Sequence, residues 1–296
     1  MALLDLKRPE NVSGDFFVDS TCIDCDLCRQ IAPDTFAQAG EQAAVYHQPA
    51  THETEFAALK ALISCPTSSI GALGTHDTKA AVKAYPELVA ENVFFCGFAA
   101  ESSYGASSYF IKRESGNILI DSPRFARPLV KQIEEMGGVK YLFLTHRDDV
   151  ADHKKWSAHF QAERLMHSND IGRSTQEIER ALTGNEPIQL DEEVLLIPTP
   201  GHTRGHMVLL YRNQFLFSGD HLWWSPNFQS LYASPNVCWY DWNEQTISME
   251  RLTDYRFEWV LPGHGRRFHA DAEEIRQQML ACVERMKASP RYTGWM

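Results

Sequence analysis

The chain lacks the features by which membrane, secreted and nucleic-acid-binding proteins are recognised. No apolar run in its 296 residues approaches the length of about 20 residues that spans a bilayer, and its N-terminus shows no small-residue cleavage pattern. Positive charge is scarce, since 28 lysines and arginines stand against 39 aspartates and glutamates, whereas nucleic-acid binders usually carry a basic surface. We therefore expect a cytoplasmic protein with no membrane and no nucleic-acid partner, acting on a small-molecule substrate.

Cysteine is present in an odd number, and the seven residues are unevenly spread. Without a secretion signal, this favours metal ligands or buried thiols over disulfides. Cys22, Cys25 and Cys28 follow one another in the run CIDCDLC, and Cys65 comes later, directly before Pro66. Thiolates at this spacing can hold three corners of an iron-sulfur cubane, and a remote Cys-Pro can close the fourth. The other three lack such a spacing and are expected in the core: Cys96, Cys238 and Cys282.

The segments CIDCDLCRQIAPDTF and SCPTSSIG resemble the bacterial-type ferredoxins. This resemblance implies an α+β ferredoxin-like domain over residues 1–75 that binds one 4Fe-4S cluster. The ligands that it implies are Cys22, Cys25, Cys28 and Cys65. A zinc site or a set of buried thiols is the alternative, although zinc sites more often pair two CxxC units.

A segment poor in bulky apolar residues follows. The stretch GALGTHDTKAAVKAYPELVAE carries two glycines and a proline, so we expect a linker over residues 76–91. Beyond it, strand-like runs alternate with helical patterns, as in the strand at Tyr141–Leu144 before the helix at Asp152–Glu163. This alternation predicts a layered α/β domain over residues 92–296, with sheets inside and helices outside.

Histidine and aspartate recur in this second part where apolar strands end. The four motifs are THRDDVADH at 145–153, TPGHTRGH at 199–206, SGDHL at 218–222 and LPGHG at 261–265. A sheet edge can direct such side chains into a shared cleft. One motif alone is weak evidence, but four in succession predict a metal site.

The order of these motifs, preceded by the strand pair SSYFIKRESGNILIDS, resembles the metallo-β-lactamase superfamily of hydrolases and oxidoreductases. The resemblance implies an αββα sandwich with one or two metals at the sheet edges. It implies that His146 and His202 bind the first metal and that Asp220 bridges to the second. The remaining ligands of the second metal would be Asp152, His153 and His264. With an aspartate at the bridging position, the chain resembles the glyoxalase II and flavodiiron branches of this superfamily.

The first motif departs from the family pattern H-x-H-x-D-H. Asp148 stands where the second histidine is usual, and two small residues lengthen the stretch before Asp152. If the chain stays extended, side chains alternate and Asp148 points the same way as His146, whereas Asp149 replaces Asp148 as ligand if the backbone kinks. A carboxylate here shifts the preference from zinc toward iron or manganese. The alternative is a scaffold that has lost its metal.

Other side chains near the motifs are open to more than one interpretation. His206 and His221 adjoin predicted ligands and are expected to support them rather than to bind metal. Aromatic residues are dense from His221 to Trp242. They either line an apolar substrate pocket or form the surface against which the ferredoxin-like domain packs.

An iron-sulfur domain fused to a metal site implies electron delivery, because a cluster passes single electrons and contributes nothing to simple hydrolysis. We expect a metal-dependent oxidoreductase whose cluster supplies electrons to a mono- or dinuclear site, with iron favoured and zinc or manganese as alternatives. Asp220 and Asp152 are its expected catalytic residues, and an electron-donor protein or reductase its expected partner. The alternative is a metal-dependent hydrolase of a thioester, lactone or other ester with a structural or regulatory cluster. A third interpretation is an electron carrier or redox sensor without enzymatic activity.

Overall fold

The computed structural model describes residues 2–289. The chain forms two compact units, which we call the first unit (residues 1–142 and 151–162) and the second unit (residues 143–150 and 163–296). The division predicted from the sequence, with a domain boundary between residues 75 and 92, stays a prediction. Within the described residues, no helix has the length and apolar character that crossing a membrane requires.

The cysteine-rich part of the first unit contains short elements packed on a small core. Strand β1 (Phe16–Val18) pairs antiparallel with β4 (Ile70–Ala72), and β2 (Phe36–Ala39) forms a hairpin with β3 (Gln42–Val45). Helix α1 (Leu27–Ile31) and helix α2 (His52–Ser64) cover the core. Thr51 caps α2 by accepting a hydrogen bond from the Thr54 backbone N–H, and the helix ends directly before Cys65.

The segment expected to be a linker contains regular structure. It holds helix α3 (Lys79–Lys83) and strand β5 (Glu87–Ala90), and β5 pairs antiparallel with β6 (Val93–Phe95). The buried hydroxyl of Tyr85 accepts a hydrogen bond of 2.8 Å from Ser64, and Lys60 forms an ion pair with Glu87. These contacts tie the segment to α2. The scarcity of bulky apolar residues in the segment had given no sign of them.

The first unit continues with consecutive antiparallel strands. Strand β7 (Tyr109–Ile111) pairs with β6 and with β8 (Ile118–Ile120), and all residues of β7 and β8 are buried. Helix α4 (Arg127–Glu135) follows, then β9 (Tyr141–Phe143), which crosses into the second unit, and α5 (His153–Phe160). The predicted hairpin at 108–121 is therefore present.

The second unit is built on a six-stranded sheet of order β12-β13-β14-β15-β18-β19. These strands are β12 (Ile188–Asp191), β13 (Val194–Pro198), β14 (Met207–Tyr211), β15 (Phe215–Gly219), β18 (Trp259–Pro262) and β19 (Phe268–His269). The parallel pair β10 (Glu163–His167) and β11 (Arg180–Leu182) and the ribbon β16 (Trp223–Ser225) and β17 (Ser230–Tyr232) complete its strands.

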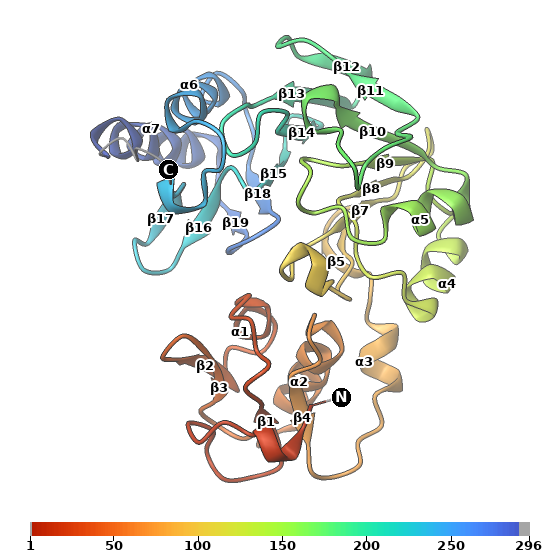
Figure 1. Cartoon of the computed structure of the whole chain (residues 1–296), viewed down its shortest axis with the longest axis vertical. Coiled ribbons are helices and arrows are strands. Elements are labelled where there is room, and N and C mark those ends of the chain that lie inside the picture. Colours follow the sequence, from red (N-terminus) through yellow and green to blue (C-terminus); the bar gives the residue numbers. More distant parts are fainter. Residues whose placement is uncertain (1, 290–296) are drawn as a thin grey trace. The chain divides into compact units, whose positions relative to one another are not determined.

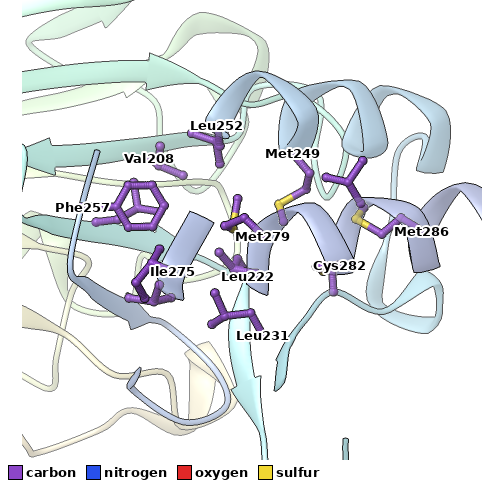
Figure 2. Packing of buried hydrophobic residues seen from close by; sticks show 14 of the residues in the cluster. Val208, Leu222, Leu231, Met249, Leu252, Phe257, Ile275, Met279, Cys282 and Met286 are labelled. Atoms are coloured by element: carbon purple, nitrogen blue, oxygen red, sulfur yellow. The ribbon is translucent and has the colours of Figure 1, made fainter. Parts of the chain in front are cut away.

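Two helices pack on this sheet. Helix α6 (Trp242–Leu252) and helix α7 (Ala272–Ala288) lie side by side (Figure 1). Their apolar faces meet Val208 of β14 and Leu222, together with Phe257, in one buried cluster (Figure 2). Large apolar residues at this spacing stabilise the unit mainly by removing apolar surface from water.

Strand register brings the ends of the sheet's strands together. β15 runs parallel to β18, with Gly219 beside Pro262, so the residues that follow both strands emerge at one edge. β13 and β14 are antiparallel, with Pro198 opposite Met207, so the loop between them emerges at that end. The Met207 backbone N–H donates to the carbonyl of Thr145. The histidine and aspartate motifs of this unit are thereby placed at neighbouring strand ends.

Candidate metal centres

The four cysteines of the N-terminal part line one small cavity of the first unit. Cys22, Cys25, Cys28 and Cys65 surround it together with Pro66. Burial, together with the neighbouring sulfurs of Cys65 and Cys22, raises the pKa of Cys25 to about 12. Burial raises the pKa of Cys28 as well, with the other three sulfurs adding to the effect. The four sulfurs therefore lie close enough to act on one another.

This donor set fits an iron-sulfur cluster. Buried thiolates at such short range repel one another, and cationic iron offsets that cost. The Ser69 backbone N–H donates to Cys65 Sγ over 3.3 Å, which is the kind of contact that steadies a sulfur ligand. Arg29, on α1, is held by Asp26 and Asp24. The cavity thus combines four candidate sulfur ligands with a backbone N–H that donates to one of them.

A second group of ligand-type side chains lies within the second unit. His146 follows β9, His202 lies in the loop after β13, Asp220 directly follows β15, and His264 follows β18. Asp220 Oδ2 is 3.7 Å from His146 Nε2 and 3.8 Å from His202 Nε2. It is also 3.8 Å from His264 Nε2. One carboxylate oxygen therefore faces all three imidazoles.

Asp148 and Asp149 both enter this group, although the sequence presented them as alternatives. Asp148 Oδ2 lies 3.9 Å from His146 Nε2 and 3.8 Å from His202 Nε2. Asp149 Oδ1 lies 3.7 Å from His264 Nε2, and this side chain is buried. The backbone leaves the extended conformation after Phe143 and bends from Thr145 onward, so strict alternation no longer applies. Two ligand clusters result, one on the side of His202 and one on the side of His264.

Gly263 allows the two buried carboxylates to approach the loop before His264. A Cβ atom at this position would lie 2.7 Å from Asp149 Oδ2 and 2.8 Å from Asp220 Oδ1. Both distances are shorter than real side chains tolerate, so any larger residue would displace an aspartate. The LPGHG motif thus supplies a candidate ligand and the space beside it.

Asp152 and His153 belong to the first unit. Asp152 precedes α5, accepts a hydrogen bond of 2.8 Å from the Phe125 backbone N–H and pairs with Lys155 at 2.7 Å. His153, the first residue of α5, is buried. Their assignment to the second metal stays a prediction, and within the second unit Asp149 takes the place beside His264.

The charges of the second-unit group fit a cation. Burial lowers the pKa of His146 to about 3, although Asp220 acts in the opposite direction, so the imidazole is neutral and able to bind metal. Burial and the charge of Asp220 raise the pKa of Asp149 to about 7. Burial opposes ionisation of Asp220 too, but the nearby histidines outweigh it and lower its pKa.

Several ligand atoms of this group are buried without a hydrogen-bond partner among the described residues. They are His146 Nε2, both ring nitrogens of His202, Asp149 Oδ2 and Asp220 Oδ1. Buried polar atoms normally have a hydrogen-bond partner. A bound cation would account for ring nitrogens and carboxylate oxygens that are buried without one. The set of imidazoles and carboxylates present therefore fits one or two metal ions.

Asp170 is a supporting residue that the sequence did not reveal. It is buried in η3 (Ser168–Asp170) and accepts hydrogen bonds from Thr203 Oγ1 and the Gly205 backbone N–H, which lie in the loop of His202. It also accepts from the Arg147 backbone N–H at 3.1 Å. One carboxylate thus fixes two ligand-bearing segments. No motif marked it, because its partners are mostly backbone groups.

His206 and His221 are buried, and the His206 ring lies beside the rings of His146 and His202, whereas their expected supporting role stays a prediction. His206 Nδ1 lies 2.8 Å from Thr199 Oγ1, and its ring stacks on that of His221 at 5.1 Å. Burial lowers the pKa of both imidazoles, to about 3 for His221, so both rings are uncharged.

The aromatic segment from 221 to 242 divides between two surroundings. Trp224 and Trp242 pack against the core of the second unit. Trp239 is 60% exposed, and its backbone N–H donates to the carbonyl of His202. Its ring lies 6.3 Å from that of His202. Part of the segment is therefore core, and Trp239 lies beside the candidate ligands.

Comparison with known families gives these two parts their assignments. Residues 18–72, which include all four cysteines of the cavity, match the model described as the 4Fe-4S single cluster domain of ferredoxin I. This stretch is a single-cluster ferredoxin domain. The α+β domain expected from the cysteine motif is thereby confirmed, and its implied cofactor is one 4Fe-4S cluster.

Solved structures show the fold of the remainder. A metallo-β-lactamase from Pontibacter korlensis covers 68% of this chain and 98% of its own, with a TM-score of 0.53 at 15% identity. One from Erythrobacter litoralis covers 67% of this chain and 95% of its own, also with a TM-score of 0.53 and 15% identity. The ferredoxin domain is thus followed by a metallo-β-lactamase fold, as expected.

A sequence relative supports the same conclusion. The beta-lactamase-like protein 2 homolog of Drosophila melanogaster is 25% identical over 189 residues, which is 57% of this chain. The chain spans 62% of that protein's length.

Proposed function

We propose that this chain is a metal-dependent oxidoreductase in which the 4Fe-4S cluster supplies electrons to a mono- or dinuclear iron site that acts on a small molecule. The proposal joins the ferredoxin domain at 18–72 with the ligand group around Asp220. A low-potential electron-donor protein or reductase would be its partner.

The composition of the second-unit ligand group carries this proposal. Three carboxylates, those of Asp148, Asp149 and Asp220, lie among three imidazoles. Carboxylate-rich sets favour iron or manganese over zinc more than sets of histidine and cysteine do. An iron-sulfur cluster in the same chain gives such a site a source of single electrons.

The residues of this chain have separable tasks in the proposed enzyme. A bound iron would supply one-electron chemistry and polarise an oxygen-containing substrate. Asp220 stays ionised between the histidines and is the carboxylate that we assign to catalysis. Thr145 Oγ1, 3.0 Å from His146 Nδ1, orients that ring. Asp152 is the second catalytic residue proposed from the sequence, and the Phe125 backbone N–H and Lys155 hold its carboxylate in place.

Ester hydrolysis is the second candidate. It is supported by the shared fold with proteins named metallo-β-lactamases and by imidazole and carboxylate ligands, which zinc also accepts. In that case the cluster would be structural or regulatory, and turnover would need no reductant.

Anaerobic purification followed by metal analysis and EPR of the oxidised and reduced protein separates the two. The oxidoreductase requires iron at the second site in addition to the four irons of the cluster, and a second-site EPR signal that changes when the cluster is reduced. In Cys25→Ser, which lacks a cluster ligand, that change should be lost. Zinc at the second site, or an unchanged signal in the wild-type protein, would favour the hydrolase and overturn the proposal.

A further inference from the structure

A loop outside the ferredoxin domain lies against the cluster cysteines. Gly105 has a positive φ of 82°, and a Cβ atom there would lie 2.6 Å from Cys25 Cβ and 2.9 Å from Cys25 Sγ. It would also lie 3.2 Å from Pro66 Cγ, next to Cys65. Only glycine satisfies both the backbone conformation and this approach. The chain beyond the family match therefore lies in contact with Cys25 and Pro66, two residues that line the cavity.

Hydrogen bonds hold this loop in place. The Gly105 backbone N–H donates to the carbonyl of Ala100, and the Ala106 backbone N–H donates to that of Ser103. Ser103 Oγ accepts from the Ala151 backbone N–H at 3.2 Å. The loop is thus a closed turn with a second anchor near α5, and it covers part of Cys25.

Arg124 places a positive charge near the cavity. Its Nη2 donates to the carbonyl of Ile63, two residues before Cys65, over 2.8 Å. Its Nε is buried without a hydrogen-bond partner among the described residues. Burial lowers the pKa of Arg124, while Cys65 and Asp152 oppose that effect, so both lie within electrostatic reach.

We propose that Gly105 and Arg124, both outside the ferredoxin domain, set the reduction potential of its cluster. On reduction, the cluster gains one electron from a low-potential one-electron donor, no bond forms or breaks, and one negative charge is added. Arg124 stabilises that charge and raises the potential, whereas the loop at Gly105 excludes the water that would stabilise it and lowers the potential. The inference rests on the cluster and not on the chemistry of the second site, so the two can fail separately.

Potentiometric titration of the cluster EPR signal under argon tests this. In Arg124→Gln the ratio of reduced to oxidised cluster at a fixed potential should fall about tenfold, which is about 59 mV for one electron. Arg124→Lys should stay close to the wild type. Gly105→Ala should shift the potential upward. The matched control is Gly40→Ala, which replaces a glycine of similar φ, 64°, with no atom within 4 Å of the added Cβ.

Iron content normalises each titration. If Arg124→Gln loses the cluster, Arg124→Met, which keeps the apolar stem without the charge, takes its place. Potentials of Arg124→Gln or Arg124→Met equal to that of the wild type, with full cluster content, would overturn the role of Arg124. A Gly105→Ala potential that moves no more than that of Gly40→Ala would overturn the role of the loop.

A different observation concerns the surface beside Asp148. The second unit has an open depression of about 580 Å³ there. It is lined by Arg147, Asp148, Asp170, Gly172, Arg173 and Ser174. The depression thus adjoins one of the candidate metal ligands.

Most charged side chains of this depression that lack a close ionic partner are positively charged. The Asp170 carboxylate is already engaged by three donors. Arg147 makes only a 3.9 Å contact with Asp148 and is half exposed. Arg173 forms no ion pair with any described residue and is exposed. Two guanidinium groups therefore face solvent beside the ligand group of a strongly acidic chain, and guanidinium groups bind carboxylates and phosphates well.

We infer that this depression binds an anionic group of the substrate, a carboxylate, phosphate or sulfonate, next to the metal site. This inference rests on the proposed function, because it names the substrate class of the same site. Titration calorimetry with inorganic phosphate on the metal-loaded protein tests it. Arg147→Gln and Arg173→Gln should each weaken binding about tenfold. Arg212→Gln, which removes an exposed arginine paired with Glu193, should leave it unchanged.

Phosphate affinity that is lost on metal removal but unaffected by either depression variant would mean that phosphate binds the metal, and would overturn the inference. Electron transfer to the second site plays no part in this measurement. Failure of the proposed oxidoreductase chemistry would therefore leave the result intact.

Discussion

Two carboxylates in a buried metal site lower the stability of the metal-free protein and strengthen metal binding. The variant Asp149→Asn separates these two effects. In the metal-free protein, burial and Asp220 raise the pKa of Asp149 to about 7, against about 3.9 in the unfolded chain. Between these values the folded protein keeps a proton that the unfolded chain loses, so stability falls as the pH rises through this window. Above pH 7 the full cost is reached. Three pH units correspond to about 4 kcal/mol.

Urea unfolding of the metal-free protein, followed by tryptophan fluorescence, measures this cost. Asp149→Asn should be more stable than the wild type at about pH 8, by up to about 4 kcal/mol, and the gain should vanish near about pH 4. With metal the order should reverse, because the wild type gains more binding free energy than a variant lacking a ligand. Asp148→Asn is the matched control, since Asp148 is half exposed and should gain less.

A metal-free Asp149→Asn protein that is less stable than the wild type at about pH 8 would refute this reasoning. It would mean that contacts within the protein stabilise the ionised Asp149 carboxylate, so that its burial does not depend on a bound cation. Equal stabilisation of both proteins by metal would refute its role as a ligand.

Three further outcomes are expected. Cys28→Ser should lose the visible absorbance of the cluster but keep its second-site metal, as metal analysis would show; loss of both would contradict separate centres. Leu222→Ala, at a fully buried position, should cost about 2–5 kcal/mol in urea unfolding, and a cost below about 1 kcal/mol would contradict the packing in Figure 2. For His76, burial lowers the pKa, but hydrogen bonds to Asp15 and Glu55 outweigh it and the pKa is raised. Its stabilising effect should be complete below about pH 6.5 and be lost as the pH rises further, so the difference in melting temperature between the wild type and His76→Gln should shrink with increasing pH.

The parts of the fold with strong local signals could be predicted from the sequence. The hairpin of β7 and β8 is a pair of apolar runs around a Glu-Ser-Gly turn, and the cysteine spacing pointed to the ferredoxin domain. Helix α6 was missed, although Asp241 caps it by accepting from the Asn243 and Glu244 backbone N–H groups. Such a residue before a helix is a recognisable start signal. Strand β5 was missed because its stability comes from pairing with β6 and not from its own composition.

The candidate site was predictable as far as its candidate ligands follow strand ends. His202, Asp220 and His264 emerge where the sequence placed them, because strand register determines those positions. The roles of Asp148 and Asp149 depend on a bend after Thr145 that no residue type in the motif signals. Asp170 was beyond reach of the motif, since its partners from the His202 loop lie more than 30 residues away in the chain.

Oxidation of the methionines between α6 and α7 would report how often these two helices separate. Met249, Met279 and Met286 are each at most 2% exposed, so dissolved oxidants reach their sulfur atoms only when the helices separate. Oxidation to the sulfoxide makes the side chain polar and disfavours reclosure. Mass spectrometry of peroxide-treated protein would therefore count how often this half of the molecule opens. The same three sulfurs would limit how long the fold lasts in the presence of peroxide.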